Sequence, residues 1–156
     1  MRVLGRALCA LFCLAPVASS WAAPVGPSAP SQFLQVRTFG TACATVSTGS
    51  VRLDLRTLKD GSTTFAYEIP AKQVAVIRSV RFDAAAAAAT SVTVFLEMAG
   101  NYVAYTEGFT DAAGRFQGVF AFDPGVEVSN LANFCVRTQT GGSIGAIATG
   151  FLTKDK

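Results

Sequence analysis

The chain has 156 residues, a length typical of one domain, with 51% hydrophobic and 15% charged residues. It contains no histidine, which excludes serine–histidine and cysteine–histidine catalysis in their usual forms and argues against imidazole-ligated zinc. Of the 13 basic residues, Arg2 and Arg6 lie in a predicted signal peptide, so 11 remain against 10 acidic residues, a net charge of +1. A nucleic-acid-binding surface is therefore not indicated.

Residues 1–22 have the pattern of a signal peptide. Arg2 and Arg6 precede an apolar run at 7–18 that is too short to span a bilayer as a helix, and small residues place cleavage after Ala22 or, alternatively, after Ser20. We therefore predict a secreted or periplasmic protein with no membrane span after cleavage; an uncleaved anchor is the alternative. Residues 23–31 are rich in proline and serine and are predicted to form a disordered lead-in.

Two cysteines remain beyond the signal peptide, Cys43 and Cys135. A pair of cysteines in an oxidising compartment predicts a disulfide. No Cys-x-x-Cys spacing suggests thiol exchange, and no glycine-rich phosphate loop suggests a nucleotide. We therefore expect a structural bond and no cofactor.

Residues 32–156 carry the signals of a single β domain, with β-branched and aromatic residues, period-two alternation and frequent turn residues. The alanine run at 84–89 is too short for an independent helix and is predicted to be a loop with at most one helical turn. About nine short strands are expected, over 33–39, 51–56, 63–69, 74–83, 91–98, 102–107, 116–122, 134–138 and 144–152, with a further short one at 126–128. Such a chain favours an all-β, antiparallel, jelly-roll-like β-sandwich with one disulfide.

Paired carboxylates are the catalytic chemistry that this composition permits. Glu97 and Glu107 flank a predicted turn at 99–101, and a glycosidase needs two carboxyl groups about 5 Å or 6.5–9.5 Å apart. The alternative is that both are solvated charges on an outer face. Asp111 and Asp123 lie in predicted turns, where they serve either a calcium ion or, as is usual, the backbone through Asx-turns.

Apolar side chains on the predicted outer faces indicate a contact surface. If Val94 and Leu96 face the core, Phe95 faces outward, and Val119 does so if Phe120 faces inward. Tyr102 and Tyr105 are predicted to have opposite facings, so that one of them joins Phe95. Arg78 interrupts an apolar face, which indicates either an ion pair at an oligomer axis or a β-bulge.

The segments 69–82 (IPAKQVAVIRSVRF) and 142–152 (GSIGAIATGFL) resemble, in their pattern of strands and turns, small exported bacterial β-sandwich proteins. The resemblance implies an exported all-β fold and supplies no catalytic residue. We predict a non-enzymatic binding or structural module that forms homo-oligomers or binds another exported protein, with Arg78, Phe95, Tyr102, Tyr105 and Val119 as candidate interface residues. The alternative is a carbohydrate-active protein, either a lectin or a glycosidase, with a glycan as its partner.

Overall fold

The computed structural model describes residues 32–43, 50–58, 60–139 and 142–155, which form one antiparallel sheet. The signal peptide and lead-in predicted for residues 1–31 lie outside the described residues. The elements are β1 (Phe33–Ala42), β2 (Val51–Thr57), β3 (Thr63–Thr64), β4 (Gln73–Ala85), β5 (Ser91–Met98), β6 (Asn101–Phe109), β7 (Arg115–Val128), the short 3₁₀ helix η2 (Leu131–Asn133), β8 (Phe134–Thr138) and β9 (Ser143–Lys154).

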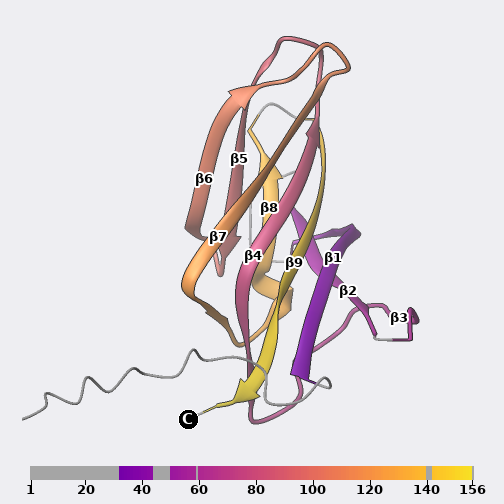
Figure 1. The fold of residues 1–156 in the computed structure, drawn as a ribbon, viewed down its shortest axis with the longest axis vertical. Helices are drawn as coiled ribbons and strands as arrows, with labels where there is room; N and C mark the ends of the chain where they lie inside the picture. The colour runs from indigo at the N-terminus through magenta and orange to yellow at the C-terminus, as the bar shows by residue number, and fades with distance from the viewer. Residues whose placement is uncertain (1–31, 44–49, 59, 140–141, 156) are drawn as a thin grey trace, which may run out of the picture.

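The strands follow the order β6-β5-β8-β2-β1-β9-β4-β7, with β3 paired to β2. This continuous path curls into a nearly closed barrel, in which β6 and β7 are the two ends (Figure 1). The all-β antiparallel prediction is confirmed, whereas the two-sheet, jelly-roll-like sandwich is not. Alternation along each strand predicts which face is buried, but only long-range strand pairing decides whether the sheet divides into two or curls on itself.

The core is formed by the side chains that alternate inward along each strand. Leu53 and Leu55 of β2 are fully buried, as period-two patterning predicts, and Asp54 between them is buried as well. On β7, Phe120 lies in the core with its ring centroid 5.2 Å from that of Phe82. A Cβ at Gly118 would lie 2.5 Å from the Phe82 ring, so only glycine leaves room for this packing.

A β-bulge at Arg78 changes which residues of β4 face the core. The register moves from Ile77 paired with Gly150 to Ser79 paired with Thr149, which leaves Arg78 unpaired. Strict alternation along 74–83 predicts that Val74, Val76, Val80 and Phe82 share one face, and the bulge makes this prediction wrong. The core-facing residues before the bulge are Ala75 and Ile77, and those after it are Val80, Phe82 and Ala84. The alternative of a bulge at Arg78 is confirmed.

Three other sequence-based boundaries differ from the structure. The strand predicted over 63–69 is only β3, two residues long. The separate strand at 126–128 is the end of β7, which runs on through a cis Asp123–Pro124 bond. The alanine run contributes Ala84 and Ala85 to β4 and then forms a non-helical turn in which Ala89 has a φ of 53°. Burial of Ala84 within the sheet overrides the helix preference of alanine.

The segment after β3 buries Tyr67 against the sheet instead of continuing as a strand. The Tyr67 amide donates to the Asp54 carbonyl at 2.8 Å, and Arg56 Nη1 donates to the Tyr67 hydroxyl at 2.8 Å. The Arg56 guanidinium also lies 4.6 Å from the centre of the Tyr67 ring. Burial raises the pKa of the Tyr67 hydroxyl above its ordinary value, although the charge of Arg56 opposes the shift.

This shift predicts a loss of stability in alkaline solution. The folded state holds the Tyr67 proton more tightly than the unfolded state, so its contribution is complete below about pH 10 and declines as the pH rises through the raised folded pKa. Between about pH 9 and pH 11, we expect the free energy of unfolding to fall less for Tyr67→Phe than for the wild type, as measured by urea unfolding. Tyr105→Phe, at an exposed tyrosine, is the control and should behave like the wild type. Identical slopes for Tyr67→Phe and the wild type would contradict this assignment.

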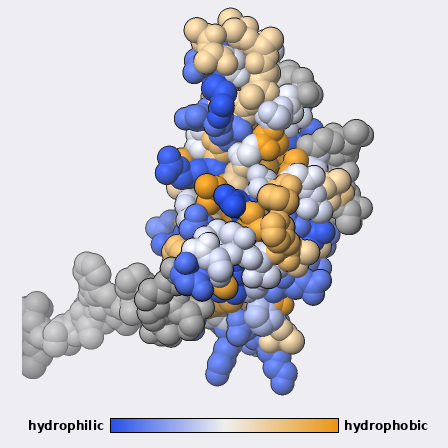
Figure 2. Space-filling model, turned by 90° about the vertical axis from the view of Figure 1, so that its right-hand side faces the viewer, coloured by the Kyte–Doolittle hydropathy of each residue, from blue (hydrophilic) through white to orange (hydrophobic). Residues whose placement is uncertain are grey.

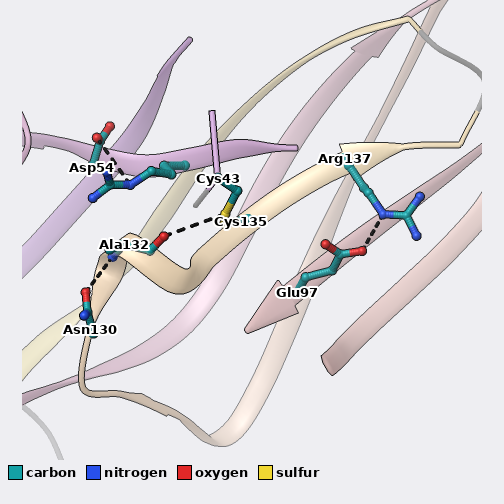
Figure 3. Close-up of a disulfide and its surroundings, with 8 residues drawn as sticks. Cys43, Asp54, Glu97, Asn130, Ala132, Cys135 and Arg137 are labelled. Atoms are coloured by element: carbon teal, nitrogen blue, oxygen red, sulfur yellow. Dashed lines mark hydrogen bonds and ion pairs between the residues drawn. A yellow bond between two sulfur atoms is a disulfide. The ribbon is translucent and has the colours of Figure 1, made fainter. Parts of the chain in front are cut away.

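The predicted disulfide between Cys43 and Cys135 is confirmed. It joins the residue that follows β1 to the second residue of β8, across 92 positions of sequence, with a Cα–Cα distance of 6.4 Å. Figure 3 shows the bond between Asp54 of β2 on one side and the Glu97–Arg137 ion pair on the other. The disulfide therefore lies between two ion pairs, Arg52–Asp54 of β2 and Glu97–Arg137 of β5 and β8.

Candidate functional site

The candidate site is built on the outer face of β8, β5 and β6, where two rows of side chains cross the strands. In the first row, the register pairs Phe95 of β5 with Tyr105 of β6 on one side and with Arg137 of β8 on the other. The second row lies on the same face, two residues further along β5, and it extends to β2. It consists of Tyr102, Glu97, Cys135 and Arg52.

Both tyrosines contact Phe95, and the cause is an irregularity in β6. The register shifts from Leu96 paired with Ala104 to Glu97 paired with Tyr102, which leaves Val103 as an extra residue. Tyr102 and Tyr105, three positions apart, thus point to the same side, and their ring centroids lie 5.0 and 6.2 Å from that of Phe95. The prediction of opposite facings is wrong, because strict alternation does not survive a bulge.

Arg137 holds these rings together. Its guanidinium carbon lies 4.3 Å from the centre of the Phe95 ring and 5.5 Å from that of Tyr102, and its Nη2 donates to the Tyr102 hydroxyl at 2.8 Å. Its Nε donates to Glu97 Oε1. Burial alone would lower the pKa of Arg137, but the interactions with Glu97 and, to a smaller extent, Tyr102 together outweigh burial and raise the pKa, so the guanidinium stays charged.

Glu97 is buried beneath this surface, with 1% of its area exposed. Oε1 is engaged by Arg137, whereas Oε2 has no hydrogen-bond partner among the described residues. The prediction of a solvated outer-face charge is therefore wrong for Glu97. Glu107 pairs with Thr93, four residues along β5 from Glu97, which separates the two positions by about 13 Å. This spacing exceeds what hydrolysis by the pair requires.

We use the term aromatic surface for Phe95, Tyr102, Tyr105 and Arg137, together with Phe109. The three aromatic side chains of β6 are strongly exposed: Tyr102 is 62%, Tyr105 65% and Phe109 72% accessible. Arg137 and Phe109 were missed by sequence analysis. Phe109 lies just beyond the predicted end of its strand, and nothing in the local pattern indicates that Arg137 would reach rings on two neighbouring strands.

The other two predicted interface residues lie elsewhere. Arg78 donates from Nη1 to the Pro124 carbonyl at 2.6 Å, and its Nη2 lies 3.6 Å from Asp123 Oδ1. Val119 is exposed on β7 and lines a cleft described below. The five candidate residues are therefore divided among three regions, and only Phe95, Tyr102 and Tyr105 are brought together.

The turn predicted at Asp111 is present, whereas the one predicted at Asp123 is wrong because Asp123 lies within β7. Asp111 Oδ1 accepts from the amides of Ala113 and Arg115 at 2.9 and 2.8 Å, as an Asx-turn does. Within the described residues, no group of three or more histidine, cysteine or acidic side chains is arranged to hold a metal ion. The same part of the chain contains no helix of the length and apolarity needed to cross a membrane.

Comparison of the chain with protein-family models, curated proteins and solved structures finds no match.

Proposed function

We propose that this protein is an exported, non-enzymatic binding module that self-associates through the aromatic surface. The single observation that carries the proposal is the exposure of Tyr102, Tyr105 and Phe109 on one face of a strand that ends the sheet. Tyrosine, tryptophan and arginine dominate the binding energy of protein interfaces, and the Arg137–Phe95–Tyr102 stack is of that composition.

The position of these side chains favours a second copy of the chain as the partner. Among the described strands, β6 pairs only with β5, so the other edge of β6 offers backbone groups for pairing. Two copies of an antiparallel edge strand can pair about a two-fold axis, which gives each subunit the same contacts. The aromatic residues of both β6 strands would then form one continuous surface beside the new pairing.

Rigidity of the site also supports binding. Arg137 is fixed by Glu97 and by the Tyr102 hydroxyl, so Phe95 and Tyr102 lose little conformational entropy when a partner covers them. Tyr105 and Phe109, in contrast, are free to adapt to the partner because most of their surface is exposed.

The test is the oligomeric state of the mature protein. We expect sedimentation equilibrium to show a dimer, and we expect Tyr105→Glu to weaken dimerisation at least tenfold, about 1.4 kcal/mol, because a charge then replaces an aromatic ring that the second copy would cover. Phe39→Glu is the matched control, since Phe39 is 60% exposed but lies on β1, away from the aromatic surface.

Two results would overturn the proposal. One is a wild-type protein that stays monomeric at about 1 mM, which leaves less than about 4 kcal/mol for association. The other is an equal loss of dimer in Tyr105→Glu and Phe39→Glu. Thermal unfolding of each variant shows whether it is folded, and both substitutions replace exposed side chains that the core does not need.

A glycan is the alternative partner, because two exposed tyrosines on one face can stack against a sugar ring. Separation of Glu97 from Glu107 removes the geometric support for a hydrolase that uses this pair, so this alternative is limited to binding. Saturable binding of an oligosaccharide by a monomeric protein, abolished by Tyr105→Ala, would favour it over self-association.

A further inference from the structure

A second surface, on the opposite part of the sheet, has the features of a ligand site. A cleft of about 720 Å³ lies over β1, β9, β4 and β7. One row of outward side chains crosses all four strands, because the register pairs Ile147 with both Arg37 and Arg81, and Arg81 with Val119. Figure 2, which shows the molecule from the side of β1 and β2, has apolar residues in its middle surrounded by hydrophilic ones.

Arg37 and Arg81 differ from the other described arginines. Each of the others is engaged by a carboxylate, a backbone carbonyl or a tyrosine hydroxyl, at Arg52, Arg56, Arg78, Arg115 and Arg137. The side chains of Arg37 and Arg81 have no hydrogen bond or ion pair to any described residue, and both line the same cleft. Asp83 also lines the cleft, but its carboxylate is held by Arg115 and Gln117. The cleft therefore has uncompensated positive charge.

The cleft exists because β1 leaves β9 at this point. The last pair between them is Arg37 with Ile147, after which the Thr38 hydroxyl accepts from the Ala146 amide at 3.0 Å and the strand turns away. Gly145 contributes no side chain next to the gap. A Cβ built there would meet only Thr38 Oγ1, at 3.9 Å, so the space above Gly145 is open.

We infer that this cleft binds a small amphipathic carboxylate. The positions of Arg37 and Arg81 are two strand spacings apart, about 10 Å, so a carboxylate above Ile147 lies between two guanidinium groups. Ile147 and Val119 are both exposed in the cleft and would cover a short apolar chain. The volume falls within the range of about 300–1,000 Å³ typical of small-molecule sites.

The positive charge of the two arginines and the apolar side chains of the cleft each lead to a separate prediction about the ligand. We expect octanoate to bind in isothermal titration calorimetry with a dissociation constant below about 1 mM. Octylamine, with the same chain and the opposite charge, and inorganic phosphate, with charge and no chain, should bind at least tenfold more weakly. Equal binding of octylamine or of phosphate would overturn the inference, as would no binding of octanoate.

Gly145→Val is the sharpest variant because it fills the cleft without removing any charge. Gly145 has no positive φ and open space at its Cβ, so the variant should fold, and we expect it to lose octanoate binding at least tenfold. Arg81→Gln should show a similar loss, whereas Arg78→Gln, an arginine outside the cleft, should bind like the wild type. Unchanged binding in a folded Gly145→Val protein would overturn the assignment.

Tyr105→Glu separates this site from the proposed function, since it should leave octanoate binding intact.

Discussion

Removal of the disulfide by Cys43→Ala together with Cys135→Ala is expected to lower the free energy of unfolding by about 4 kcal/mol. The bond closes a loop of 92 residues, and in the chain-entropy model such a loop restricts the unfolded chain by roughly 4–5 kcal/mol. Alanine is preferred to serine because Cys135 is fully buried, and a serine hydroxyl there would add a second cost. That loss is a large fraction of the 5–15 kcal/mol that stabilises an ordinary domain.

Urea unfolding of the oxidised wild type, the reduced wild type and the double alanine variant measures this contribution. The reduced protein and the variant should agree within about 1 kcal/mol, and both should have a larger m-value than the oxidised form because their unfolded chains are more open. A difference of less than about 1 kcal/mol between the oxidised and the reduced wild type would contradict the prediction.

Arg137→Leu is expected to cost about 3–5 kcal/mol of stability. The substitution leaves the Glu97 carboxylate buried without its cation, and removal of one partner of a buried ion pair has this magnitude. It also removes the guanidinium that contacts Phe95 and Tyr102. The aromatic surface should lose its order together with the ion pair, so this variant should also bind its partner more weakly.

A double-mutant cycle separates the ion pair from simple loss of packing. Glu97→Leu combined with Arg137→Leu should be more stable than either single variant, because no buried charge then remains unpaired. Arg115→Ala is the matched control, since the Arg115–Asp83 pair is partly exposed and such pairs contribute about 0–1 kcal/mol. Strict additivity of the two leucine substitutions would contradict the assigned role of the Glu97–Arg137 pair.

The candidate site was predictable in part. Phe95 lies between Val94 and Leu96, so alternation placed it on the outer face, where the structure also has it. Which tyrosine would join it was not predictable, because the extra residue at Val103 arises from the pairing of β6 with β5. Arg37 and Arg81 could not be selected either. Their lack of partners depends on where Asp54, Asp83, Glu97 and Asp123 point once the sheet has formed.

The sequence by itself determined the all-β class, most strand positions and the identity of the disulfide, because period-two alternation, turn residues and the two cysteines beyond the predicted signal peptide are local signals. Only the tertiary structure decided that the strands form one curled sheet, that Glu97 is buried beneath Arg137, and that two arginines far apart in sequence share one cleft. These features depend on strand order and on bulges at Arg78 and Val103, which are set by contacts between segments distant in the chain.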